Sequence, residues 1–340
     1  MKDQSPTIKE WRRLYEVATE FKKIECWDWM YDSDLFGVQN PDDGQIGYCC
    51  VLGNFGEMFG MTMYLGSEGL GGYLKLQSGE ITETDPDVLH YQKCLMISFE
   101  DRDYLQKEDI QLIKKLGLKF RGRNEWPMFR SYRPGYVPWF LTKEEALFLT
   151  AAIEQAIDVA LRFEEDEDLL TAPGGNEYLI RIPDKIEDII LWEDRWMKPA
   201  PVEKTRVLDD RVDEVRIQKI KKGAVKTDSI WEIEIAFAPM PVGEKKERPY
   251  FPKMLAVMDH RSMMALDLYM FEIWSDASEF RNHFLSFLEE KGILPQEILV
   301  TKEETLQIIA PIASLLKIRV KSVSSLLAFE ELYYGMIDSL

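Results

Sequence analysis

Four carboxylates in the second half of the chain are of the residue type that binds divalent metal ions. Asp259 lies in a predicted turn, Asp267 in the strand that follows it, and Glu303 and Glu304 at the start of a predicted helix. Carboxylate oxygens bind Mg²⁺ or Mn²⁺, which can polarise a phosphate and activate water for phosphodiester hydrolysis. The four acids are therefore candidate catalytic residues if the fold brings them together.

Three of these acids also have an ordinary structural interpretation. Asp259 is a turn former, and carboxylates in the first turn of a helix, such as Glu303 and Glu304, interact favourably with the helix dipole. We favour this interpretation and expect no resident metal or other cofactor. A metal-dependent activity with Mg²⁺ or Mn²⁺ is the alternative.

Basic and aromatic residues gather in residues 114–140 of an otherwise acidic chain. Arginine can hold phosphates or carboxylates while aromatic rings stack on a planar ligand. Prolines at positions 127, 134 and 138 equally indicate an extended connection whose rings pack on the core and whose arginines pair with nearby acids. We favour the second interpretation, which leaves as candidate ligand-binding residues Arg121, Arg123, Trp126, Arg130, Tyr132 and Arg133.

Several familiar catalytic patterns are missing from the sequence. The glycines near residue 70 fit no nucleotide-binding fingerprint, and there is no Gly-x-Ser-x-Gly elbow. The three histidines lack metal or triad spacing, and the four cysteines include no CxxC pair. We expect reduced, buried thiols and no zinc site.

The first half predicts an antiparallel sheet with flanking helices. An apolar stripe between residues 8 and 21 follows a Thr-x-x-Glu capping box, and a second capping box opens a long helix at Thr142. Short apolar runs separated by turn sequences predict three strands between residues 35 and 65. A further strand at 93–100 and a helix at 107–116 complete an N-terminal α+β domain.

An acidic run at 164–168, followed by Thr-Ala-Pro-Gly-Gly at 171–175, combines self-repelling charge with helix breakers. We place the domain boundary there. The predicted domains are residues 1–168 and 176–340.

The second half predicts the order βββαβαβα. Alternation at 231–237 gives the first strand, runs at 253–258 and 263–271 give a hairpin, and helices and strands then alternate to the C-terminus. This order resembles that of ribonuclease H-like folds, and the resemblance is one of topology alone. In those enzymes an aspartate commonly ends the strand equivalent to 298–300, whereas this chain continues with Thr301 and Lys302, which disfavours catalysis.

Composition restricts the classes of binding partner and the cellular compartment that we expect for this protein. The 340-residue chain has a formal net charge of −18, which repels nucleic-acid backbones and anionic membranes. It has no apolar run long enough to cross a bilayer and no signal-peptide core at its start. We expect a cytoplasmic protein that neither enters membranes nor binds nucleic acid non-specifically.

Four stretches, 11–21, 27–34, 47–50 and 64–70, together resemble a family of uncharacterised bacterial proteins, and the second half is similar to its usual partner domain. The resemblance implies two domains of unknown function and no activity. Our leading hypothesis is a non-enzymatic binding or interaction protein, with an unknown protein partner or self-association. The alternative is a metal-dependent hydrolase of the phosphodiester class on a degenerate ribonuclease H-like domain.

Overall fold

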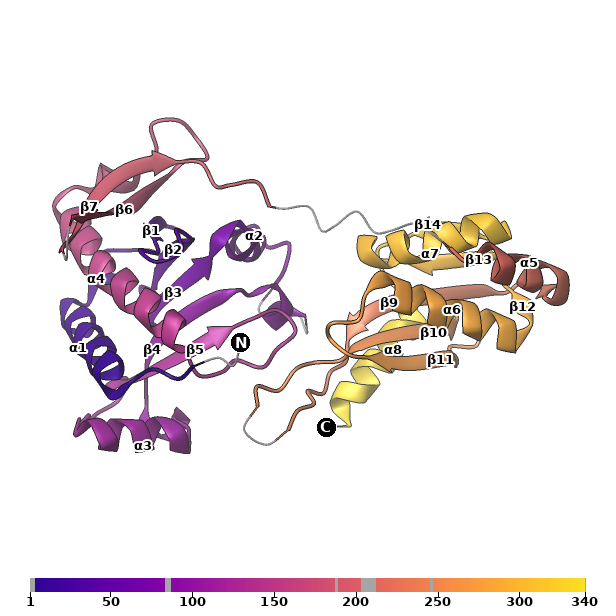
Figure 1. Cartoon of the computed structure of the whole chain (residues 1–340), viewed down its shortest axis with the longest axis horizontal. Coiled ribbons are helices and arrows are strands. Elements are labelled where there is room, and N and C mark those ends of the chain that lie inside the picture. The colour runs from indigo at the N-terminus through magenta and orange to yellow at the C-terminus, as the bar shows by residue number, and fades with distance from the viewer. Residues whose placement is uncertain (1–3, 83–86, 187–188, 203–211, 245–246, 340) are drawn as a thin grey trace. The chain divides into compact units, whose positions relative to one another are not determined.

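The computed structural model describes residues 4–82, 87–186, 189–202, 212–244 and 247–339. The chain divides into two compact units (Figure 1). The N-terminal unit comprises Met1–Pro134 and Pro138–Val202, and the C-terminal unit comprises Gly135–Val137 and Glu203–Leu340. Each unit combines helices with a sheet, which confirms the predicted α+β class.

The N-terminal unit is built on a seven-stranded sheet in the order β5-β4-β3-β2-β1-β6-β7. Neighbouring strands are antiparallel except β1 and β6, which are parallel. The strands are β1 Phe36–Gln39, β2 Ile46–Leu52, β3 Phe59–Leu65, β4 Cys94–Glu100, β5 Trp126–Tyr132, β6 Tyr178–Ile186 and β7 Ile189–Met197.

Helices cover both faces of this sheet. One face packs against α1 (Ile8–Ile24), α3 (Lys107–Leu116) and α4 (Lys143–Glu165), and the other packs against α2 (Gly66–Gln77). The predicted capping boxes are present, with Thr7 at the start of α1 and Thr142 at the start of α4. The long, apolar α4 therefore begins where the sequence indicates.

Residues 166–175, where the sequence suggests a domain boundary, connect α4 to β6 inside the N-terminal unit. β6 pairs with the free edge of β1, and its Ile180 is buried against the sheet core. The hairpin β6–β7 therefore belongs to the N-terminal sheet. Charge and helix breakers mark a surface connection, but they do not distinguish a loop within a unit from a linker between units.

All four cysteines lie in the N-terminal unit, and all are free and buried. Burial disfavours the thiolate, so it raises the pKa of Cys26 to about 12 and raises the pKa of Cys49, Cys50 and Cys94 as well. The expectation of buried, reduced thiols is met.

The C-terminal unit contains a five-stranded sheet in the order β11-β10-β9-β13-β14. Its strands are β9 Ile230–Phe237, β10 Lys253–Asp259, β11 Ala265–Phe271, β13 Glu297–Val300 and β14 Arg319–Ser322. The helices are α5 Glu214–Gly223, α6 Ala277–Lys291, α7 Glu303–Leu316 and α8 Leu327–Asp338, and β8 (Val225–Lys226) pairs with β12 (Ile293–Leu294). From β9 onward the predicted order of strands and helices is confirmed, with β12 added.

Helices also cover both faces of this second sheet (Figure 1). α5, α6 and α7 pack on the face that carries Ile233 and Ile235 of β9, and α8 packs on the opposite face through Tyr333. Because α8 covers the second face, Glu232 and Glu234 are fully buried, although their alternation in the sequence is typical of a strand with one exposed face. In the part of the chain that the structure describes, no helix has the length and apolar character needed to span a membrane.

Candidate functional site

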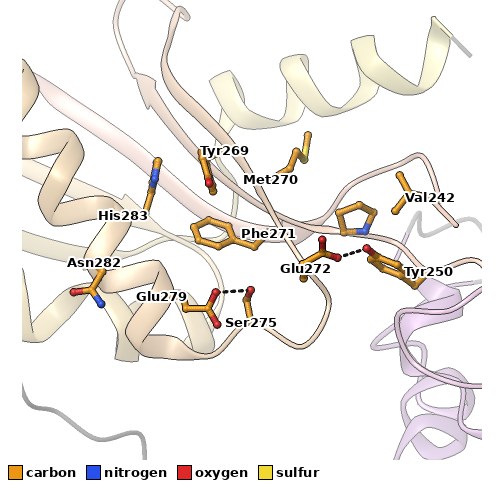
Figure 2. A pocket seen from close by; sticks show the side chains of 11 residues that line it. Val242, Tyr250, Tyr269, Met270, Phe271, Glu272, Ser275, Glu279, Asn282 and His283 are labelled. Carbon is orange, nitrogen blue, oxygen red and sulfur yellow. Dashed lines mark hydrogen bonds between the residues drawn. The ribbon is translucent and has the colours of Figure 1, made fainter.

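A cavity of about 530 Å³ opens beside the outer strand of the C-terminal sheet (Figure 2). Its walls come from the end of β11 and the residues after it, from the first half of α6, and from the connection between β9 and β10. The lining residues are Val242, Tyr250, Pro252, Tyr269, Met270, Phe271, Glu272, Ser275, Glu279, Asn282 and His283.

The cavity lies at the C-terminal end of β11. Tyr269 and Phe271 point towards α6, where they contact His283, whereas Met270 lies on the opposite face of the sheet. Successive side chains of a strand alternate between faces, so neighbouring residues can all border one cavity where it reaches round the edge or the end of the strand. Val242, Tyr250 and Pro252 lie on the β10 side, so the cavity is a groove at the C-terminal end of β11, whose outer edge has no strand partner among the described residues.

Aromatic rings form much of the wall. Tyr269 stacks on the imidazole of His283 with ring centroids 4.0 Å apart, and Phe271 meets the same ring edge-on at 5.6 Å. Tyr250 also lines the cavity, and its ring centroid lies 5.4 Å from that of Trp274, a residue outside the lining that is 69% exposed. Exposed faces of such rings attract cations.

Asp267 holds the imidazole of His283 in place. Nε2 of His283 lies 2.6 Å from Oδ2 of Asp267, and both side chains are about one fifth exposed. Since an ionised carboxylate can only accept a hydrogen bond, the Nε2–H of the imidazole donates it. Asp267, a candidate metal ligand from the sequence, thus orients a ring of the cavity wall.

Two carboxylates give the groove its charge (Figure 2). Glu272 accepts a hydrogen bond from the Tyr250 hydroxyl, and this bond raises the pKa of Tyr250. Glu279 accepts one from Oγ of Ser275 at 2.9 Å. The described lining residues include no lysine or arginine, so the groove combines negative charge with aromatic surface.

The other three acids singled out from the sequence lie apart from the groove lining and have separate partners. Asp259 accepts hydrogen bonds from the backbone N–H and the hydroxyl of Ser262, and these bonds lower its pKa. Glu303 accepts one from Gln307, and Glu304 forms an ion pair with Lys253. Among the described residues, no three His, Cys, Asp or Glu side chains are grouped so that they could hold a metal ion.

Two buried carboxylates of β9 were not among the candidates from the sequence. Glu234 accepts hydrogen bonds from Thr301 and Lys302 at the start of α7 and from the hydroxyl of Thr305. The N-cap of α7 is Lys302, which makes no side-chain cap, and Glu234 supplies the acceptor from the neighbouring strand.

Glu232 plays the same part for α8. Its Oε2 accepts hydrogen bonds from the N–H groups of Ala328 and Phe329, and its Oε1 lies 2.5 Å from Nδ1 of His260. Each buried glutamate thus satisfies backbone donors that a helix start leaves without partners. The sequence predicts the helix α8 itself. It does not predict that glutamates of β9 accept hydrogen bonds from the starts of α7 and α8.

The basic and aromatic candidates lie in the N-terminal unit and do not form one surface. Arg130 is buried in a two-bond pair with Asp109, and Arg133 pairs with Glu145. Arg121 and Arg123 are exposed, in the connection before β5. Of the two aromatic candidates, Trp126 packs against the main core, and Tyr132 packs on the opposite face of the sheet.

The residues of the groove escaped sequence analysis because their pattern indicates burial. Leu266, Leu268, Tyr269, Met270 and Phe271 occupy both faces of β11. Such a run is typical of a strand covered on both sides. The groove could have been suspected from two features of the sequence together: this apolar run and the position of its strand at the end of a predicted hairpin.

Comparison with known proteins agrees with the two-part organisation. Residues 11–181, half of the chain, match the family described as Domain of unknown function (DUF7309), and residues 216–337 match Domain of unknown function (DUF6930). No curated protein matches the chain. The chain belongs to the DUF7309 family, and its residues 216–337 are similar to DUF6930.

Proposed function

We propose that the C-terminal unit is a protein-interaction module that binds a lysine or arginine side chain of a partner in the groove beside β11. The observation that carries the proposal is the lining: aromatic rings and two carboxylates, with no lysine or arginine among its described residues. The proposal treats the protein as a non-enzymatic binding protein of the bacterial cytoplasm, in line with the sequence resemblance.

The chemistry of the groove suits a cation on an apolar stem. The aliphatic part of a lysine or arginine side chain can lie against Tyr269 while its charge reaches Glu272 or Glu279. An arginine also stacks on aromatic faces and makes two parallel hydrogen bonds to a carboxylate. An anionic ligand, in contrast, would meet like charge.

The chain offers a specific probe for this site, because it has three histidines and only His283 lines the groove. We expect the ring signals of ¹⁵N-histidine-labelled protein to report binding of N-acetyl-arginine methylamide. The His283 signal should shift in a saturable way with a Kd of about 1 mM, while His260 and His90 stay unchanged. The uncharged analogue N-acetyl-citrulline methylamide is the matched control, and equal shifts with both compounds would refute the proposal.

The substitution Glu272→Gln tests the charge directly. The glutamine oxygen can still accept the Tyr250 hydrogen bond, so the shape of the wall is retained while one negative charge is removed. We expect arginine binding to weaken about 5-fold, which corresponds to about 1 kcal/mol. Glu303→Gln, which removes an exposed carboxylate of α7 outside the groove, should leave binding unchanged.

The second candidate is a metal-dependent hydrolase, on the strength of the βββαβαβα order shared with ribonuclease H-like folds. Calorimetric titration with Mg²⁺ or Mn²⁺ tests it. Binding that disappears in Asp259→Asn would support the hydrolase, and binding unaffected by that substitution would count against it.

A further inference from the structure

We infer that the partner contributes an extended segment, whose backbone pairs with the free edge of β11 as a sixth strand and whose central arginine or lysine enters the groove. This inference rests on the proposed function and adds the conformation and the docking surface of the partner.

β11 has the features of a strand that accepts another strand. It is seven residues long, ends the sheet, and pairs only with β10 among the described residues. Alternate N–H and C=O groups of an edge strand point away from its neighbour and are available to another strand. Exposed edges are commonly protected by lysine, proline or a covering segment, but the seven residues of β11 contain neither lysine nor proline.

The exposed side chains of this edge are large and apolar. Leu268, Tyr269 and Met270 are between 40% and 47% exposed and occupy both faces of the sheet. The one irregularity in the β10–β11 register lies beside Met258, away from the groove, so the pairing from Asp267 to Phe271 is regular. An added strand could therefore pair with a regular edge and make apolar contacts on both faces of the sheet.

The groove lies where a side chain of such a strand would project. Tyr269, Met270, Phe271 and Glu272 border it in sequence, which places it at the C-terminal end of β11, where the outer edge of the strand is also free. A side chain of the added strand that points towards α6 would meet Tyr269, His283 and Glu279. The backbone of the added strand would thus pair with the same stretch of β11 that borders the groove. In such complexes the main-chain hydrogen bonds give affinity and the side-chain pockets give specificity.

The negative charge of the protein favours a basic partner segment over a second copy of the chain at the edge of β11. The chain carries a net charge of −18, and two of its acids, Glu272 and Glu279, lie at the docking surface. A basic segment is attracted by this field, whereas a second copy of the chain brings the same negative charge to the contact. The geometry and charge together point to a basic, extended segment of a different protein.

The test compares backbone pairing with side-chain binding. The probe is a capped seven-residue peptide of alternating threonine and valine with arginine at its centre. It should bind at least about 30-fold more tightly than N-acetyl-arginine methylamide, because it adds main-chain hydrogen bonds. Two N-methylated forms, each blocking one alternating set of amides, should differ by at least about tenfold, since only one edge of the peptide faces β11.

Leu268→Lys separates the edge from the groove, because Leu268 belongs to β11 but does not line the cavity. This variant should weaken peptide binding at least about tenfold and alter binding of the blocked arginine less than about 2-fold. Leu315→Lys adds the same charge at an exposed site on α7 and should leave both affinities near those of the unmodified protein.

The outcomes distinguish the two proposals. If blocked arginine binds but the peptide binds no better, or both N-methylated forms bind equally, strand addition is refuted and the groove remains a cation site. If neither probe shifts the His283 signal, both proposals fail. If light scattering shows a dimer that Leu268→Lys dissociates, a second copy occupies the edge and the inference is wrong.

Discussion

Glu234 shows how one residue can join a strand to a helix in this protein. Its side chain is fully buried, and both carboxylate oxygens accept hydrogen bonds from groups at the start of α7. A buried carboxylate without such partners would be costly, and so would the donors if the carboxylate were removed. The stability of α7 on the sheet should therefore depend on this one acceptor.

We predict that Glu234→Gln destabilises the protein by about 3 kcal/mol, because the amide NH₂ group cannot accept hydrogen bonds from Thr301 or Thr305. Urea unfolding followed by circular dichroism measures the change. Glu304→Gln, which breaks the half-exposed pair with Lys253, should cost less than about 1 kcal/mol. Similar losses in the two variants would show that the buried hydrogen bonds contribute little.

At the scale of helices and strands, sequence reasoning succeeded where the controlling interactions are local. Capping boxes placed α1 and α4, and the helix predicted at 107–116 is α3, Lys107–Leu116. It failed where partners come from distant parts of the chain. The acceptor for α7 comes from β9, and Gly69 and Gly72 of α2 pack so closely that a Cβ would lie within 2.5 Å of the carbonyl oxygens of Lys93 and Tyr91.

The candidate site illustrates the same limit. The sequence identified Asp267 as an acid of possible chemical use, but its partner His283 lies in the next helix and its groove depends on which strand ends the sheet. Strand order is set by long-range pairing, which periodicity does not encode. The individual elements of the C-terminal unit were therefore predictable and the groove was not.

The cap of α6 gives a pH-dependent prediction. Hydrogen bonds from Ser278 and from the backbone of Glu279 lower the pKa of Asp276 from its ordinary 3.8. Because the folded pKa is lowered, the ionised cap stabilises the fold above about pH 3.8, and this contribution is lost as the pH falls through the lowered value.

We therefore expect Asp276→Ala to reduce stability by about 1 kcal/mol at neutral pH and by less at pH values below the lowered pKa. Urea unfolding at both pH values measures the difference. Asp276→Asn keeps a neutral capping group and should show a smaller, nearly pH-independent effect. A constant loss for the alanine variant would contradict the assigned role of the charge.

At the scale of the whole molecule, the division into units gives a prediction about fragments. Residues 1–202 contain every strand of the seven-stranded sheet, whereas residues 1–168 lack β6 and β7 and leave β1 as an edge. We expect the longer fragment to unfold cooperatively and the shorter one to unfold at a lower temperature and to aggregate. Thermal unfolding and light scattering test this, and equal stability would place the hairpin outside the essential fold.

The burial of every cysteine in one unit has a practical consequence. A thiol-reactive dye added to the native chain can label it only when the N-terminal unit opens, because residues 203–340 contain no cysteine. The rate of labelling therefore measures how fast the N-terminal unit opens, and no cysteine has to be introduced for the measurement. Mass spectrometry of the labelled peptides would then show whether the strands of Cys50 and Cys94 separate together or in sequence.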